Sequence, residues 1–207
     1  TVDYIVASAS LVLKQTGLLP HINAGVLTAD DYAKLRPVSA SMGLMLESTS
    51  MRLLEKGGAH HGSPDKHPDV RLESIAEAGR QSIPFTTGIL IGIGETRAER
   101  LAALVAIRDL HAAYGHIQEI IVQNFRAKPE TRMSNSAEPG IAELLWTVAA
   151  ARLILGPEIS VQVPPNLNPG QAADLIGAGL SDWGGISPVT IDHVNPEAPW
   201  PQIASLQ

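Results

Sequence analysis

Apolar residues recur at helical spacing in several segments of the chain. Over residues 141–155 they return every three or four positions until Gly156 ends the pattern. Residues 97–114 show the same spacing, and Thr96 with Glu99 three positions later is the order of a capping box. The other segments with a helical pattern are 2–16, a stretch that opens at Thr28, 69–80 and 170–177.

Short apolar runs between these segments predict strands. The runs cover residues 18–26, 41–47, 85–92, 117–123, 159–163 and 183–187. Strands that alternate with helices form βα units and a parallel sheet. About six units, each followed by polar residues, favour a (β/α) barrel over a doubly wound sheet. We therefore expect an α/β fold, a partial TIM-type barrel that lacks one or two units at its front, because a full barrel has eight.

Length, composition and charge narrow the class of protein. The chain has 207 residues, 44% hydrophobic and 17% charged, which fits one domain over 1–207 that forms the C-terminal part of a larger barrel. A net charge of −6 without a basic cluster excludes a nucleic-acid-binding face. The apolar stretches are too short to cross a bilayer, and no leader pattern opens the chain. We expect a cytoplasmic protein that binds neither nucleic acid nor membrane.

The run 88–96, Gly-Ile-Leu-Ile-Gly-Ile-Gly-Glu-Thr, joins a strand end to a glycine turn and a helix start. Strand ends that precede a helix N-terminus are where α/β proteins hold small ligands. Gly92 and Gly94 leave room for a flat ligand against the main chain. Arg97 stands where a dinucleotide fingerprint has its third glycine, so that motif is rejected. A tight turn without a ligand explains the two glycines equally well.

Polar side chains follow every predicted strand, and a parallel barrel gathers such side chains at one rim. They are His21, Asn23, Glu47, Ser48, Glu95, Gln123, Asn124, Arg126, Lys128, Asn166, Asn168, Asp182, Asp192, His193 and Asn195. Amides with one or two cations suit a ligand rich in hydroxyl and carbonyl groups, such as a ribityl chain or a pyrimidine. Residues 123–128 predict a clamp for an anion or a carbonyl, and a solvated loop is the less favoured alternative.

Two further clusters have ordinary explanations. His60, His61 and His67 with Asp65 could bind a metal, but loop histidines without regular spacing are more often solvated. The methionines of 42–51 are better explained as core residues than as cofactor contacts. The chain has no cysteine, which excludes disulfides, thiol nucleophiles and thiolate metal ligands within it. We assign no metal ligand and no catalytic residue from the sequence.

Six blocks of the sequence resemble one enzyme family. They are residues 19–25 (Leu-Pro-His-Ile-Asn-Ala-Gly), 41–48, 62–66, 84–96, 123–129 (Gln-Asn-Phe-Arg-Ala-Lys-Pro) and 182–185 (Asp-Trp-Gly-Gly). In order and over essentially the whole chain, they are similar to the radical S-adenosylmethionine enzymes that build a deazaflavin coenzyme. The glycine block is generic to that superfamily. Blocks 123–129 and 182–185 favour the ring-closing 7,8-didemethyl-8-hydroxy-5-deazariboflavin synthase over its sister, which joins tyrosine to the uracil.

The resemblance implies cofactors, a reaction and site residues. A [4Fe–4S] cluster cleaves S-adenosylmethionine to a 5′-deoxyadenosyl radical, which takes a hydrogen atom from the hydroxybenzyl–ribitylaminouracil adduct before ring closure and loss of ammonia. Gly88, Leu90, Gly92 and Glu95 would lie along the adenine and ribose of S-adenosylmethionine, and Glu47 with Ser48 would contact its ribose or methionyl part. The hypothesised substrate-binding residues are Gln123, Asn124, Arg126, Lys128, Asn166, Asp182 and His193.

The sequence departs from this family in its cluster ligands. The family's Cys-x3-Cys-x2-Cys loop and the acidic block after the second strand are both absent, and a chain that starts at the helix after that strand explains both gaps. We therefore expect the chain alone to be inactive. Partners consistent with the resemblance are the small-molecule substrate and the sister subunit or domain. Alternatives are a cysteine-free S-adenosylmethionine-binding paralogue, the sister enzyme, or an unrelated barrel that binds a phosphorylated sugar at the helix starting at Arg97.

Overall fold

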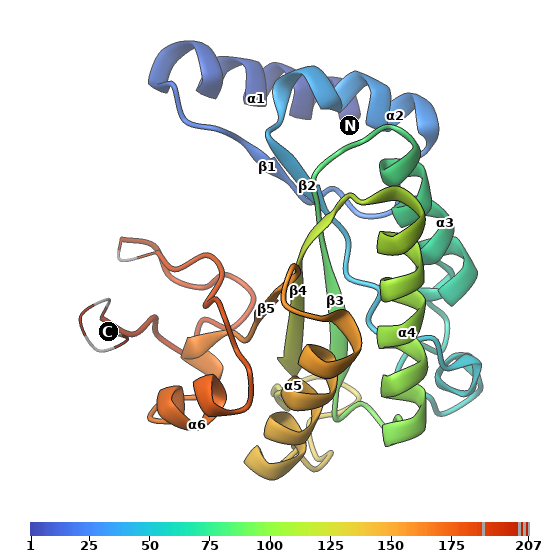
Figure 1. Cartoon of the computed structure of the whole chain (residues 1–207), viewed down its shortest axis with the longest axis vertical. Coiled ribbons are helices and arrows are strands. Elements are labelled where there is room, and N and C mark those ends of the chain that lie inside the picture. The colour runs from blue at the N-terminus through green and yellow to red at the C-terminus, as the bar shows by residue number, and fades with distance from the viewer. Residues whose placement is uncertain (188, 203, 205, 207) are drawn as a thin grey trace.

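Five parallel strands form one sheet whose spatial order, β1-β2-β3-β4-β5, is also their order along the chain. The computed structural model describes residues 1–187, 189–202, 204 and 206. The strands are β1 (His21–Ile22), β2 (Ser41–Gly43), β3 (Phe85–Ile91), β4 (Ile117–Asn124) and β5 (Ser160–Gln162). The order never reverses in this sheet, as it would at the switch point of a doubly wound fold, so the arrangement is that of a barrel segment (Figure 1).

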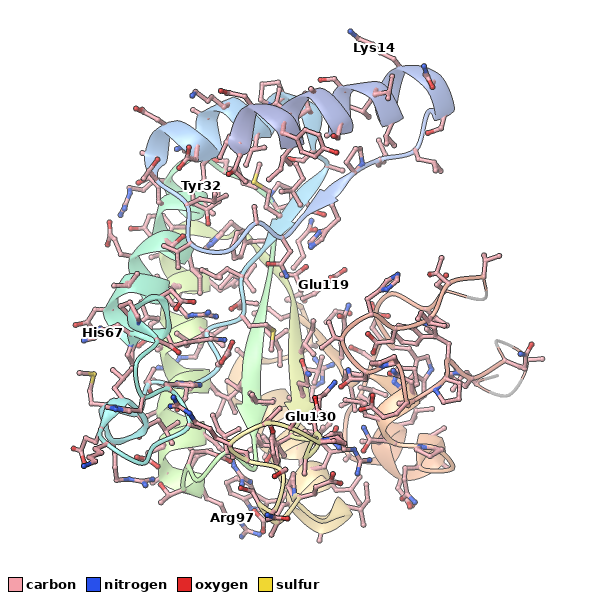
Figure 2. All side chains as sticks on the ribbon, turned by 180° about the vertical axis from the view of Figure 1, so that it is seen from behind. Lys14, Tyr32, His67, Arg97, Glu119 and Glu130 are labelled. Carbon is pink, nitrogen blue, oxygen red and sulfur yellow. The ribbon has the colours of Figure 1, made fainter. Side chains whose placement is uncertain are left out.

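Helices connect successive strands. The α-helices are α1 (Val2–Thr16), α2 (Ala29–Leu35), α3 (Pro68–Arg80), α4 (Arg97–Tyr114), α5 (Ile141–Leu155) and α6 (Ala172–Gly177). The 3-10 helices are η1 (Arg36–Val38), η2 (Met51–Leu54), η3 (Pro64–Lys66) and η4 (Pro165–Leu167). Tyr32 of α2 and Arg97 at the start of α4 lie near opposite ends of the molecule in Figure 2. The predicted helices 2–16, 97–114 and 141–155 are confirmed to the residue. No helix in the described residues is long and apolar enough to span a membrane.

Capping groups set the starts of two helices. The Thr96 hydroxyl accepts a hydrogen bond from the Glu99 amide at 3.2 Å, and the Glu99 carboxylate accepts one from the Thr96 amide at 2.6 Å. Thr28 and Asp31 form the same reciprocal pair before α2. Each pair satisfies amides that a helix start leaves without intrahelical partners. At the other end of α4, Gly115 adopts φ 66°, the left-handed conformation that closes many helices.

The strands are shorter than their apolar runs, and one prediction is wrong. Within 18–26 only His21–Ile22 pairs as a strand, and within 41–47 pairing resumes after Ser41–Gly43 only at Glu47, which bridges Ile89. The predicted strand 183–187 is absent. Instead the Asp182 carboxylate accepts from the Gly184 amide at 2.9 Å, and Gly184 adopts φ 72°, which turns the chain out of the extended conformation. The described residues therefore form five strands, where about six units were expected.

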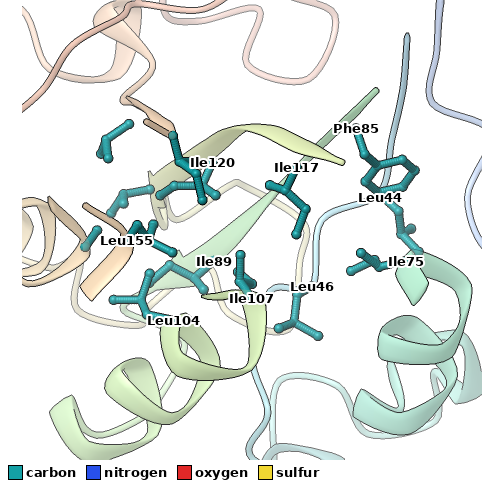
Figure 3. Packing of buried hydrophobic residues seen from close by; sticks show 14 of the residues in the cluster. Leu44, Leu46, Ile75, Phe85, Ile89, Leu104, Ile107, Ile117, Ile120 and Leu155 are labelled. Carbon is teal, nitrogen blue, oxygen red and sulfur yellow. The ribbon is translucent and has the colours of Figure 1, made fainter. Parts of the chain in front are cut away.

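One face of the sheet packs against helices and forms the core. Ile89 of β3, Ile120 of β4 and Leu104 of α4 are each at most 1% exposed (Figure 3). Because successive side chains along a strand point to opposite faces, the residues between the buried ones lie on the other face. We call this the inner face. It carries Thr86, Gly88 and Leu90 of β3 and Glu119, Ile121 and Gln123 of β4.

Candidate ligand site at the carboxyl ends of the strands

A cavity of about 700 Å³ opens where β3 and β4 end. We call it the first cavity. Its base is formed by Leu90, Gln123, Asn124, Phe125, Arg126 and Lys128. Side chains from the loop after η2 and from residues 131–133 supply further walls, together with Asn195. Sites for small molecules typically enclose roughly 300–1,000 Å³ and place a few polar groups in apolar surroundings, so this cavity is of that kind.

A second cavity of about 860 Å³ lies beside the turn that follows β3. Residues 92–95 and residues 136–139 both line it. The two cavities share Ala59, His61, Arg132 and Met133. They are therefore neighbours, separated by side chains of two loops, and molecules bound in both would lie close together.

The Glu95 carboxylate holds the glycine turn in shape. It accepts hydrogen bonds from the amides of Gly92 and Ile93, each at 2.8 Å, and from Nε of Arg100 at 2.7 Å. Its side chain is only 1% exposed. The resemblance implies that Glu95 contacts S-adenosylmethionine, and in the structure its carboxylate oxygens bind the chain's own groups. The part of the turn that is left for a ligand is its main chain.

The glycines around this turn have different roles. At Gly88 an added Cβ would lie 2.1 Å from the Ile121 carbonyl oxygen, so the close approach of β3 and β4 requires glycine. At Gly92, with φ 90°, a Cβ would lie 2.4 Å from Cδ of Pro139, so the proline ring fills the space beside this glycine where we expected room for a flat ligand. Only Gly94 borders open space, since its nearest neighbour would be Leu53 at 3.9 Å.

Glu47 joins β3 through its backbone. Its amide donates to the Gly88 carbonyl at 2.9 Å, and its carbonyl accepts from the Leu90 amide at 3.0 Å. The residue adopts φ 65°, an uncommon conformation for a residue with a side chain. Ser48 follows as a buried residue whose hydroxyl accepts from the Ser50 amide at 3.1 Å. This strained connection fixes the Glu47 side chain beside the carboxyl half of β3.

Three basic side chains surround the Glu47 carboxylate. His60 Nε2 lies 3.1 Å and Arg71 Nη1 lies 3.2 Å from its oxygens, and Lys66 Nζ donates a hydrogen bond to it. Burial would raise the pKa of Glu47, but hydrogen bonds from His60 and Lys66 and the charges of Lys66 and Arg71 lower it to about 2. The carboxylate is therefore ionised and its charge is compensated by the protein. The contact with S-adenosylmethionine that the resemblance implies for Glu47 would therefore involve a carboxylate that already has cationic partners in the protein.

The histidines of the loop do not form a metal site. In the part of the chain that the structure describes, no group of three or more His, Asp or Glu side chains is placed to hold a metal ion. His60 is 6% exposed and faces Glu47, whereas His61 lines both cavities. The pairing of Glu47 with His60, Lys66 and Arg71 could not be predicted from the sequence, because no spacing rule connects a loop to a carboxylate 13 or more residues earlier.

Arg126 and Lys128 bind backbone carbonyls of later segments. Arg126 donates to the Glu138 carboxylate at 2.5 Å and also to the Leu167 carbonyl oxygen. Lys128 donates to the Val194 carbonyl oxygen. The two cations thus attach η4 and the segment around residue 194 to the end of β4, and at the same time they line the first cavity. A clamp for a ligand's carbonyl or anion at these two residues stays a prediction, since the carbonyls that they bind here belong to the protein.

The remaining predicted substrate residues are divided between the cavity and its surroundings. Asn124 is buried, and its Oδ1 accepts from Asn168 Nδ2 at 3.0 Å. Asn166 donates to the Asp192 carboxylate at 2.9 Å, and Asp182 accepts from Gln162 Nε2 at 3.1 Å. His193 is exposed. The structure brings Gln123, Asn124, Arg126 and Lys128 together around the first cavity, but Asn166, Asp182 and His193 are not among its lining residues.

The N-terminus of α4 already holds an anion of the protein. The Glu99 carboxylate accepts hydrogen bonds from the Thr96 amide at 2.6 Å, from Ser50 Oγ at 2.5 Å and from Arg52 Nη2 at 2.8 Å. Although burial raises the pKa of Glu99, the hydrogen bond from Ser50 and those from Thr96 and Arg52 lower it to about 2. An ionised carboxylate at this helix end disfavours a phosphate, so the phosphosugar alternative loses its site.

The chain is similar in sequence to several FO synthases, although no model of a known family matches it. It is 56% identical over 209 residues to the FO synthase of Nocardia farcinica and 58% identical over 208 residues to that of Mycobacterium tuberculosis. Each of these matches covers 100% of this chain and 24% of the relative. It is 54% identical to the 7,8-didemethyl-8-hydroxy-5-deazariboflavin synthase of Methanopyrus kandleri, covering 62% of that protein. The chain thus spans about a quarter of the first relatives and less than two thirds of the last.

Solved structures share the fold at low sequence identity. HydG, a maturase of the [FeFe]-hydrogenase, superposes with a TM-score of 0.73 at 19% identity. The match covers 87% of this chain and 41% of the HydG chain. Methylornithine synthase superposes with a TM-score of 0.70 at 17% identity, and this match covers 99% of this chain and 60% of the methylornithine synthase chain. The expected α/β barrel segment is confirmed by these matches. The chain is therefore a homologue of the FO synthases over its whole length, and it shares the fold of these two solved structures.

Proposed function

We propose that this chain forms part of the catalytic barrel of a radical S-adenosylmethionine enzyme that closes the deazaflavin ring. In this proposal residues 1–207 are one domain, the C-terminal part of the barrel, and the substrate is the hydroxybenzyl–ribitylaminouracil adduct, which loses ammonia. The observation that carries the proposal is the 54% identity, over the whole chain, to a protein named for the ring-closed product. The polar cavity at the ends of β3 and β4 supports it, because the adduct is rich in hydroxyl and carbonyl groups.

The residues of the second cavity fit S-adenosylmethionine. The open main chain at Gly94 suits a flat base, and Arg132 suits a carboxylate. When bound, S-adenosylmethionine supplies the organic radical that begins this class of reaction. The adduct would occupy the first cavity, where Gln123 and Asn195 offer amide groups. Because the cavities share a wall, this arrangement keeps cofactor and substrate adjacent.

An iron–sulfur cluster does not fit these residues. The 207 residues contain no cysteine, and thiolates are the usual ligands of such clusters. No step through a cluster is therefore assigned to this chain, and in the proposal the thiolates come from another part of the complete enzyme. The tasks left to this chain are to bind and orient the two small molecules and to exclude water from them.

Turnover by the full-length protein tests the proposal. The protein is reconstituted anaerobically with iron and sulfide and supplied with S-adenosylmethionine, a reductant and the adduct. The expected result is fluorescent deazaflavin and ammonia in equal amounts. Formation of the adduct from tyrosine and ribitylaminouracil would instead assign the sister reaction. Binding of S-adenosylmethionine without either turnover would indicate the non-catalytic paralogue, and absence of binding would refute the proposal.

A further inference from the structure

The inner face of the sheet carries a row of polar side chains outside the two cavities. We call His21, Ser41, Thr86 and Glu119 the polar row. His21 Nδ1 lies 2.8 Å from Ser41 Oγ, and Thr86 Oγ1 donates to Glu119 Oε2 at 2.9 Å. Strand register places these residues side by side, since His21 pairs with Ser41 and Thr86 pairs with Glu119. Figure 2 shows Glu119 near the start of β4, well before the carboxyl end.

Gly43 joins the two halves of the polar row. It pairs with Thr86 in the sheet, and a Cβ on Gly43 would lie 3.0 Å from His21 Nε2. The imidazole therefore lies over the glycine, on the side of Thr86 and Glu119. Burial lowers the pKa of His21, and the negative charge of Glu119 opposes this shift. The histidine and the carboxylate thus lie on the same face of four neighbouring strands.

The inner face leads from the first cavity to the polar row without a side chain in the way on β3. Leu90 and Gln123, which line the cavity, share this face with Thr86 and Glu119. Gly88 lies between Thr86 and Leu90 and can carry no side chain, because its Cβ would meet the Ile121 carbonyl oxygen. Four residues of strand separate Thr86 from Leu90, roughly 13 Å. A ligand longer than a single ring can span this distance.

The chemistry of the polar row matches a chain of hydroxyl groups. The Glu119 carboxylate accepts hydrogen bonds, the Ser41 and Thr86 hydroxyls both donate and accept, and a neutral His21 ring offers one donor and one acceptor. The row contains no Lys or Arg to favour a phosphate and no apolar surface to favour a ring. We propose that the polar row binds the ribityl chain of the substrate while the substrate's ring system lies in the first cavity. This inference rests on the proposed function for the identity of the polyol.

Equilibrium dialysis of the full-length protein tests the polar row without turnover. The probes are ribitylaminouracil and the same uracil with a methyl group in place of the ribityl chain. The unaltered protein should bind the ribityl compound at least tenfold more tightly, because each lost hydrogen bond to a polar or charged group weakens binding by about three- to a hundredfold. Thr86→Val combined with Glu119→Gln should remove this preference and leave the affinity for the methyl compound unchanged.

Two controls keep the result specific. Glu158→Gln replaces an exposed carboxylate in the turn before β5 and should leave both affinities unchanged. Ser41→Ala is a milder change within the row and should reduce the preference for the ribityl compound partially. It replaces the double variant in the test if the double variant fails to fold. Equal weakening of both probes, or an undiminished preference, would show that the row does not bind the chain. A ribityl preference without ring closure would overturn only the proposed function, and ring closure with an undiminished preference would overturn only the polar row.

Discussion

Arg100 donates a hydrogen bond from Nε to the Glu95 carboxylate at 2.7 Å, and the two side chains are 7% and 1% exposed. The same guanidinium donates to Glu143 at 2.8 Å and to the Thr147 hydroxyl at 3.2 Å on α5. One arginine of α4 therefore connects the glycine turn after β3 to the neighbouring helix. The turn that borders the second cavity depends on this connection for its shape.

We predict that Arg100→Ala lowers the free energy of unfolding by about 3–5 kcal/mol, because it leaves the buried Glu95 carboxylate without its cationic partner. Urea denaturation of the protein measures the change. Hydrogen exchange should also quicken at the Gly92 and Ile93 amides, which the carboxylate orders. Arg108→Ala on the same helix breaks only an exposed pair with Asp109 and should cost at most about 1 kcal/mol. Equal losses from the two substitutions would contradict this assignment.

Gly88→Ala should be among the most destabilising single changes in the sheet. The added methyl group would lie 2.1 Å from the Ile121 carbonyl oxygen, so β3 and β4 would have to separate. We expect a loss of about 2 kcal/mol or more, measured by thermal or urea unfolding. Gly177→Ala is the matched control, because it lies in α6 with nothing within 4 Å of the new Cβ. It should be neutral or slightly stabilising, since alanine favours helix.

The ionised Glu47 should make the free energy of unfolding depend on pH below about 4.5, the ordinary pKa of this carboxyl group. Its pKa falls from 4.5 to about 2 in the folded protein, so the unfolded state takes up a proton first as the pH drops. The contribution is present above about pH 4.5 and is lost as the pH falls toward 2, and it amounts to at most about 3 kcal/mol. Urea titrations of the unaltered protein and of Glu47→Gln should converge over this interval. A stability difference that stays constant from pH 5 to pH 2 would contradict the assignment.

In the proposed enzyme, Arg126→Ala should impair turnover of the adduct more than binding of S-adenosylmethionine. Arg126 lines the first cavity and holds Glu138 and the Leu167 carbonyl, so its loss loosens one wall of the proposed substrate site. We expect kcat/KM for the adduct to fall by about a hundredfold, as is common when a bound substrate loses its positioning. The Kd for S-adenosylmethionine, measured by equilibrium dialysis, should change less than about threefold. Parallel losses in both quantities would exclude a role confined to the substrate.

The helices and the parallel sheet could be predicted because their signals are local. The amphipathic pattern of 141–155 and the capping box before 97–114 each lie within one segment, and the structure matches both to the residue. The prediction of a strand over 183–187 is wrong because the segment is short and contains two glycines. A turn closed by the Asp182 side chain outweighs its apolar character. Local composition alone does not show whether the apolar character of the segment or the turn at Asp182 has the larger effect.

The positions of the site residues could be predicted, but the direction of their hydrogen bonds could not. Gln123 and Arg126 reach the predicted rim because parallel strands bring their carboxyl ends together. The family resemblance implies that Glu47 and Glu95 contact S-adenosylmethionine, but the sequence gives no sign of the protein groups that bind their carboxylates. Their partners, among them Lys66 and Arg100, lie in later elements whose paths depend on the whole fold.

The carbonyl oxygens that Arg126 and Lys128 bind do not titrate. Mild acid that protonates the neighbouring carboxylates would therefore leave the C-terminal segments attached to β4. A competing acceptor for the two cations, such as a strongly bound anion in the first cavity, would weaken these two contacts. Occupancy of that cavity, and not acidity, is then the variable that would loosen them.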